Sequence, residues 1–348
     1  MSGFISRGGK RVTGRRLVIV LGTCVIAVAM IAVLAPLFGR GGSGRLELLG
    51  FDAFTPGSID HDVLWVRIPR VLAALVTGAA LAGAGCALQA LLRNPLAEPF
   101  TLGISSGSSL AAVIAIRLGA ESVLGHSAVA IAALAGATGT LFVVWQLGRV
   151  GRHLPPATLI LAGVTISMFC SSASVLIQYT SDFDDISHML VWMMGGFEAV
   201  PMSWVTYASG PIILGLGALV VYARELDALA AGPEVAASLG VAVGRTQVVV
   251  FAIASLLVGM AIAVVGPIGF IGLIVPHSLR AVLGPDHRLL LPASIICGAG
   301  ALAICDTLAR TILPLNHLPT GAVTAVIGAV FFLGILFGNK RRAAMWGA

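Results

Sequence analysis

A cluster of serines near residue 105 has the spacing of a hydrolase nucleophile. Residues 103–107 are GISSG, which matches the G-x-S-x-G pattern in which a serine attacks a carbonyl carbon. This chemistry needs a base within hydrogen-bonding distance and a third group that orients the base. His277 is a distant candidate base, and nothing near it in the sequence is suited to orient it. An intramembrane serine hydrolase is therefore a remote alternative to serines that hydrogen-bond backbone or pack between helices.

A charged side chain inside an apolar run would indicate ion-coupled chemistry. Burying one in a membrane costs at least about 2.5 kcal/mol, so such residues are retained for a use. Asp306 is the strong candidate, and Arg310 lies one helical turn beyond it, ready to pair. A pair of this kind is more typical of the end of a membrane span than of a proton relay. An ion-coupled secondary transporter remains an alternative.

Cofactor and nucleotide motifs are missing from the sequence. The one Gly-Lys pair, Gly9-Lys10, lacks the other residues of the ATP-binding loop G-x-x-x-x-G-K-[ST]. We therefore predict a chain that is not an enzyme and holds no cofactor, with any ATP and Mg²⁺ bound by a partner. His277 lacks a second ligand for a metal or haem. The cysteines form no C-x-x-C pair, and we predict neither disulfide nor metal site for Cys24, Cys86, Cys170, Cys297 and Cys305.

The composition is that of an all-α integral membrane protein. Of the 348 residues, 58% are hydrophobic and 10% are charged, against about 25% charged in a soluble domain. Apolar runs of about 20 residues, enough to span a bilayer as helix, recur along the chain. The alternating polarity of a β-barrel is absent. The net charge of +6 comes from scattered residues without a basic stripe, which excludes nucleic acid as a partner.

Apolar runs separated by breakers predict ten spans, the eighth of them short, in a single transmembrane domain over residues 1–348. One helix face in the second run, with Gly78, Ala82 and Gly85, should allow close approach of a neighbouring helix. The predicted spans are residues 17–38, 63–92, 101–118, 124–148, 157–178, 201–222, 244–265, 268–283, 289–313 and 320–338.

The basic residues predict the orientation of these spans. A basic tail, residues 1–16, precedes the first run, which is too long for the core of a secretory signal, about 7–15 residues. With this tail in the cytoplasm, fifteen Lys and Arg lie inside and six outside. The acidic residues of the loops gather mainly outside. The positive-inside rule therefore places both termini in the cytoplasm.

One cytoplasmic loop, residues 223–243, contains the mildly polar stretch LDALAAGPEVAASLG, residues 226–240. Gly232 is a natural helix stop and Pro233 a natural first helical residue, so two short helices should meet at a tight turn. Glu234 then favours the dipole of the second helix, and Gly240 ends it. Helices this short are unstable alone. They need a partner surface, either the protein's own membrane face or a cytoplasmic subunit.

Nine segments, in consistent order between Arg67 and Phe337, together resemble the FecCD family, the permeases of binding-protein-dependent ABC importers for iron-siderophore complexes, haem and cobalamin. Two of them, VWMMGGF and the segment containing NPLAEP, resemble the cobalamin branch of the family more than its other branches. The nine segments are RIPRVLAALVTGAALAGAG, LLRNPLAEPFTLGISSGSSL, LILAGV, VWMMGGF, LDALAAGPEVAASLGV, VGPIGFIGLIVPHSLR, GPDHRLLLP, CDTLAR and LPTGAVTAVIGA.

The resemblance implies a bundle of ten helices of the type II ABC importer kind in a bacterial inner (cytoplasmic) membrane, in contact with membrane lipid. It implies four partners around this chain: a second permease, which we expect to be identical, two ATP-binding cassette ATPases, and an extracytoplasmic substrate-binding protein. The assembly would translocate a ferric siderophore, haem or cobalamin into the cytoplasm.

The resemblance also assigns residues to roles. Arg67, Arg70 and Arg310 match outer arginines that grip the binding protein. Pro155, Pro156 and Ala157 stand at the inner gate, where cobalamin-type relatives carry small hydroxyl residues, so the resemblance does not extend to a polar constriction there. The coupling helices that dock in the ATPase match Leu226, Asp227, Ala228, Leu229, Ala230, Gly232, Pro233, Glu234, Ala237, Leu239 and Gly240.

Overall fold

The computed structural model describes residues 13–40, 46–125, 127–151, 153–198, 200–313 and 318–345. Most of the predicted basic tail, with Arg7, Lys10 and Arg11, lies outside the described residues, as do Arg45 and Arg152. Eight of the described helices are long and apolar enough to cross a membrane. They are α1 (Gly14–Leu37), α2 (Ile59–Leu91), α5 (Ser127–Gly148), α6 (Pro156–Tyr179), α8 (Met202–Val221), α11 (Val243–Val265), α13 (His287–Ile312) and α14 (Thr320–Met345).

Two shorter apolar helices complete the ten predicted spans. They are α3 (Ile104–Arg117) and α12 (Ile271–Leu283), at the third and eighth positions. At 14 and 13 residues they are about 20 Å long, less than the hydrocarbon thickness of a bilayer. The third is shorter than predicted because Gly103, in the left-handed region at φ +79°, ends a separate 3-10 helix, η2 (Pro99–Leu102), before α3 begins.

The remaining elements are short. A two-stranded antiparallel hairpin of β1 (Phe38–Arg40) and β2 (Leu46–Leu48) was not predicted, although the fold is otherwise helical. The other short elements are η1 (Phe51–Phe54), α4 (Ala120–Leu124), α7 (Phe183–Met194), α9 (Ala223–Ala231) and α10 (Pro233–Ser238).

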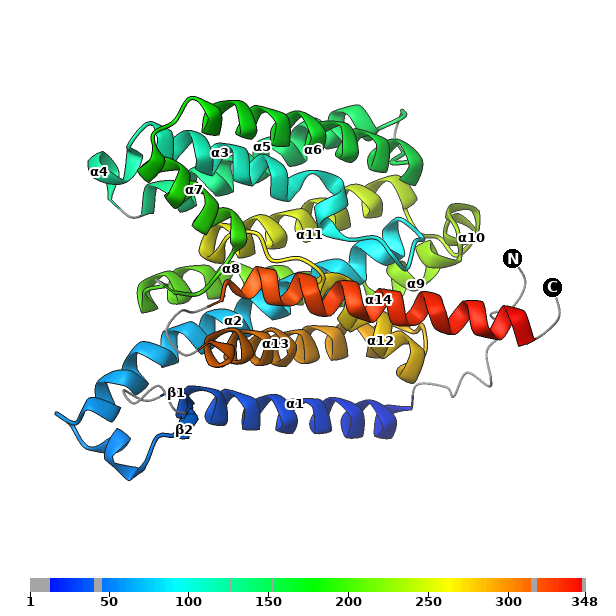
Figure 1. Cartoon of the computed structure of the whole chain (residues 1–348). Coiled ribbons are helices and arrows are strands. Elements are labelled where there is room, and N and C mark those ends of the chain that lie inside the picture. Colours follow the sequence, from blue (N-terminus) through cyan, green and yellow to red (C-terminus); the bar gives the residue numbers. More distant parts are fainter. Residues whose placement is uncertain are drawn as a thin grey trace.

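The long helices run side by side, with α2, α8 and α11 between two groups (Figure 1). Helices α3, α5 and α6 lie on one side, and α1, α12, α13 and α14 on the other. The first residue of α1 and the last of α14 lie at the same end of the bundle as α9 and α10, which we call the α9–α10 end. The hairpin and α4 lie at the opposite end, the β1–β2 end. A chain whose first and last long helices have their outer ends at the same end of the bundle crosses it an even number of times, which agrees with the ten predicted spans.

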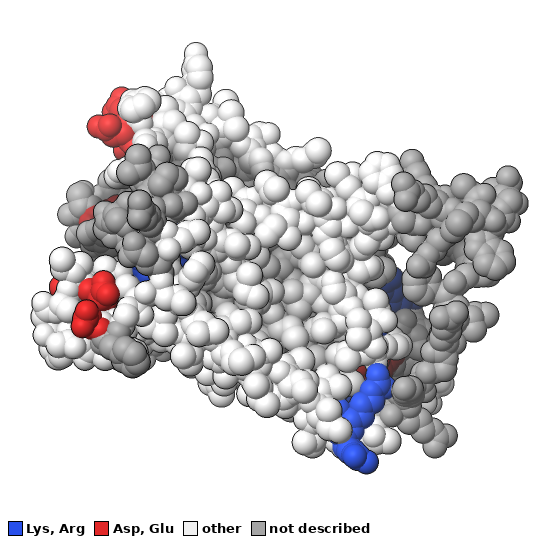
Figure 2. All heavy atoms as spheres, turned by 60° about the horizontal axis from the view of Figure 1, so that its bottom comes forward, with Lys and Arg blue, Asp and Glu red and all other residues white. Residues whose placement is uncertain are grey.

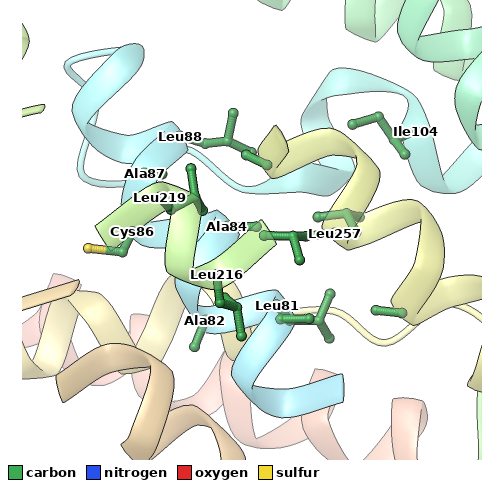
Figure 3. Packing of buried hydrophobic residues seen from close by; sticks show 14 of the residues in the cluster. Leu81, Ala82, Ala84, Cys86, Ala87, Leu88, Ile104, Leu216, Leu219 and Leu257 are labelled. Carbon is green, nitrogen blue, oxygen red and sulfur yellow. The ribbon is translucent and has the colours of Figure 1, made fainter. Parts of the chain in front are cut away.

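Helix α2 forms the centre of the core. Its Leu81, Ala84 and Leu88 are buried against Leu216 and Leu219 of α8 and Leu257 of α11 (Figure 3). Glycines bring two other helices against α2. A Cβ atom on Gly85 would lie 2.0 Å from the carbonyl oxygen of Gly272 in α12, and one on Gly78 would lie 2.3 Å from that of Gly298 in α13. The predicted face of small residues therefore makes backbone contacts that any larger side chain would block.

Charged side chains are separated along the bundle. Figure 2 shows one face on which acidic residues gather at the β1–β2 end, a broad uncharged band follows, and the largest group of basic atoms lies at the α9–α10 end. An uncharged band between two polar ends is what a bilayer requires.

Candidate functional site

The candidate site begins at the α9–α10 end, where the predicted pair of short helices is present. Helix α9 ends at Gly232, whose φ of +124° is left-handed, and Pro233 is the first residue of α10. Helix α9 packs on α2, α13 and α8. Its Leu226 and Leu229 are buried, and they lie three residues apart, on one face of the helix. The protein's own membrane body is therefore the partner surface of α9.

Helix α10 is more exposed than α9. Ala236 is buried and holds the helix to the body, whereas Val235 and Leu239 are 44% and 69% exposed. The residues of the predicted coupling set thus differ in exposure. Leu226, Ala228, Leu229 and Gly232 are buried and offer no surface for a subunit, and Asp227 is half-buried. The exposed members are Ala230, Pro233, Glu234, Ala237, Leu239 and Gly240. Docking of an ATPase on the exposed group stays a prediction.

The second feature is a buried ion cluster at the other end of α13. Asp306 is fully buried, and its carboxylate accepts hydrogen bonds from Arg70 Nε at 2.9 and 3.0 Å. A second nitrogen of Arg70, Nη2, lies 2.8 Å from Oδ1 of Asp306. Thr320 donates its hydroxyl to Oδ1 at 3.0 Å. Nε of Arg310 lies 4.0 Å from Oδ2, so the expected Asp306–Arg310 pair is present but is the weaker of the two ion pairs.

The end of α1 supplies further acceptors to this cluster. Arg310 donates to the carbonyl of Ala35, and Arg67 donates to the carbonyl of Pro36 at 3.3 Å. The last carbonyls of a helix have no partner within the helix and carry partial negative charge, so they suit a guanidinium.

The predicted docking arginines therefore have internal partners. The side chains of Arg310 and Arg70 are 4% and 11% exposed, and both point to Asp306. Arg67 is half-buried beside them. Their contact with a binding protein stays a prediction, and in this structure Arg310 would reach a partner only after the cluster opened.

The end of α2 and the loop that follows it are tied to α12 and to the residue before it by two contacts that the sequence did not reveal. The carboxylate of Glu98 accepts a hydrogen bond from the backbone N–H of Phe270, a non-glycine residue with a left-handed φ of +70°. Gln89 of α2 accepts a 2.7 Å hydrogen bond from Arg280. These partners are far apart in the sequence, and no periodicity links them.

The predicted inner-gate residues lie where α6 begins. Pro155 is the extended residue before the helix and Pro156 is its first residue; both are half-buried, and Ala157 is exposed. The next residue, Thr158, does carry a hydroxyl, but it donates to the carbonyl of Gly148 at 2.6 Å. The described contacts of this hydroxyl join the end of α5 to the start of α6. The gate itself stays a prediction.

The serine cluster pairs with backbone. Ser108 of α3 donates to the carbonyl of Ala133 in α5 at 2.8 Å, and Ser106 donates to the carbonyl of Gly103, the residue before α3, at 3.2 Å. The ring of His277 packs edge-on against two neighbouring phenylalanines of α14, with centroid distances of 6.3 and 6.0 Å. Ser105, the serine in the nucleophile position, is buried, and together these observations favour the packing interpretation over the hydrolase.

Comparison with known proteins agrees with this architecture. A solved structure, described as an inward-facing conformation of a transporter assigned to the metal-chelate type of ABC transporter, superposes with a TM-score of 0.80. It is 28% identical and covers 92% of this chain and 99% of its own.

Two curated relatives are named as permeases. The cobalamin import system permease protein BtuC of Halobacterium salinarum is 40% identical over 278 residues, which are 80% of this chain and 74% of that protein. The vitamin B12 import system permease protein BtuC of Escherichia coli is 38% identical over 315 residues, 90% of this chain and 93% of that protein. The model of the FecCD transport family matches residues 17–338, and the chain therefore belongs to this family.

Proposed function

We propose that this chain is the membrane permease of an ATP-driven, binding-protein-dependent importer, and that it carries a corrinoid such as cobalamin into the cytoplasm. The observation that carries the proposal is the 38% identity with the vitamin B12 permease of Escherichia coli, which extends over 93% of that protein. Similarity over nearly the whole length supports a shared transport path as well as a shared fold.

The proposed assembly contains a second permease, expected to be identical, two ATPases that bind ATP and Mg²⁺, and an extracytoplasmic binding protein. The exposed apolar side chains of α10 support an ATPase at the α9–α10 end, because unpaired leucine and valine beside a membrane-anchored helix suit a protein partner. The basic residues at this end support its placement in the cytoplasm, with both termini.

The structure does not favour the alternative of an ion-coupled transporter, for which Asp306 was the main candidate residue. The carboxylate of Asp306 is fully buried and paired with Arg70 and Arg310, so it belongs to a structural ion cluster and is not a free carboxylate on a transport path.

The substrate is tested by uptake of radiolabelled cyanocobalamin into cells that lack their own corrinoid permease and express this chain with its ATPase and binding protein. We expect uptake that unlabelled cobalamin suppresses and that an equal concentration of a ferric siderophore or haem leaves unchanged. Uptake of a labelled ferric siderophore or haem in place of cobalamin would reject the corrinoid assignment.

A further inference from the structure

A buried histidine joins α9 to the beginning of α13. His287 is the first residue of α13 and is 3% exposed. Its backbone N–H donates to Oδ1 of Asp227 in α9 at 2.8 Å, and its ring Nδ1 lies 2.6 Å from the same oxygen. Since a carboxylate oxygen accepts hydrogen bonds, Nδ1 carries a proton in this contact. One oxygen of α9 therefore receives two hydrogen bonds from one residue of α13.

This contact also caps α13 from outside. The first N–H groups of a helix have no partner within the helix and attract negative charge. Asp286, the residue before α13, accepts from the N–H of Arg288 at 3.0 Å, and Asp227 accepts from the N–H of His287. Arg288 is held by Asp286, with Nη2 2.6 Å from Oδ2, and this partner lowers the pKa of the Asp286 carboxyl. Helix α13 thus shares its N-terminal caps between its own chain neighbour and α9.

Packing alone does not explain why a histidine occupies position 287, because of its second ring nitrogen, Nε2. Nε2 of His287 is buried and has no hydrogen-bond partner among the described residues. An unsatisfied buried nitrogen costs free energy that a leucine at the same place would avoid. Retaining histidine there is consistent with a specific use of Nδ1.

Helix α13 connects this contact to the ion cluster. From His287 at the α9–α10 end, α13 runs 19 residues, about 29 Å, to Asp306, and Arg310 lies one turn further toward the β1–β2 end. Throughout its length α13 packs on α2, partly through the glycine contact at Gly298. Pro292 lies within α13, and the helix continues through it from His287 to Ile312. Because α13 packs on α2, we expect its two ends to move together when one end is displaced.

We propose that Asp227 and His287 form a latch that makes α9 and α13 move as one body. A displacement of α9 and α10 by an ATPase then reaches the ion cluster around Asp306 through α13. The latch rests on the proposed function, since it needs an ATPase to act on α10. Asp227 and His287 are positioning residues in this mechanism.

The test compares two substitutions of His287 in the full transporter reconstituted in proteoliposomes. In His287→Asn the amide nitrogen stands as many bonds from Cα as Nδ1 does, so the donor is kept. In His287→Leu the bulk is kept and the donor is lost. We expect His287→Leu to hydrolyse ATP but to transport about tenfold less cyanocobalamin per ATP, and His287→Asn to remain within about twofold of wild type.

A second pair of variants, at Asp227, tests the latch in case His287→Leu does not fold. Asp227→Asn keeps an acceptor oxygen and is expected to stay coupled, whereas Asp227→Ala should lose transport per ATP. The double variant Asp227→Ala/His287→Leu should be no worse than the worse single variant, because both remove one interaction.

The outcomes separate the latch from the proposed function. Unchanged transport per ATP in His287→Leu, equal losses in His287→Asn and His287→Leu, or additive losses in the double variant would each overturn the latch while wild-type uptake continued. A wild-type complex without ATP-driven uptake would overturn the proposed function, and the latch with it.

Discussion

Exchange of Val235 and Leu239 for aspartate is expected to abolish binding of the ATPase and, with it, ATP-driven transport. Val235 in α10 is 44% exposed, and Leu239, the residue that follows α10, is 69% exposed. Burial of each in an interface would contribute about 1.5–3 kcal/mol, and a buried carboxylate would add a desolvation cost. The combined loss corresponds to a weakening of at least about 100-fold. Copurification of the cognate ATPase on a tagged permease measures it directly.

A matched variant controls for this change. Val235→Ile with Leu239→Met keeps two apolar side chains of similar size at the same positions and should retain the ATPase. Both variants should insert in the membrane and elute from gel filtration as the wild type does, because the substituted positions face outward. Normal ATPase recovery with the aspartate variant would remove α10 as the docking site.

Replacement of Asp306 by asparagine is expected to destabilise the protein by about 3–5 kcal/mol. Asparagine keeps the shape of the side chain but removes the charge that Arg70 and Arg310 face. Two guanidinium groups would then remain buried with only neutral acceptors, among them the carbonyls of Ala35 and Pro36 nearby. Thermal denaturation in detergent, followed by loss of monodisperse protein, measures the effect.

An exposed ion pair of the same chemistry provides the control. Arg117 Nη1 and Asp185 Oδ2 lie 3.4 Å apart with side chains 42% and 30% exposed, so Asp185→Asn should cost less than about 1 kcal/mol. Equal melting temperatures for Asp306→Asn and Asp185→Asn would show that the buried cluster does not stabilise the fold.

Most of the helical architecture follows from local sequence. Apolar runs bounded by glycine, proline and charge predict where helices lie, because each long span must satisfy its backbone within itself. The lengths of α3 and α12 were less predictable. Their starts depend on left-handed residues, Gly103 and Phe270, and nothing in the sequence marks a phenylalanine for that conformation. The short hairpin after α1 likewise lacks a distinctive pattern.

The candidate site was predictable only where it is local. The turn at Gly232 and Pro233 was predicted because helix stop and start signals act over a few residues. Periodicity shows which residues share a helix face, but not which helices meet. Periodicity therefore could not predict that Arg70 pairs with Asp306, which lies 236 residues away in the sequence. The spacing of Leu226 and Leu229 did carry a signal for an inward face on α9, which the assignment of the whole loop to docking overlooked.

Vesicle uptake with a collapsed proton gradient tests the central claim, that ATP hydrolysed by a partner drives this permease. Proteoliposomes would contain the permease and its ATPase with ATP trapped in the lumen, on the α9–α10 side, and the binding protein and labelled cyanocobalamin outside. Each measurement would be made under an imposed proton gradient, with and without a protonophore. We expect cyanocobalamin uptake that requires hydrolysable ATP, persists with the protonophore and is lost with a catalytically dead ATPase. Uptake that continues without ATP, and stops when the protonophore is added, would contradict the claim.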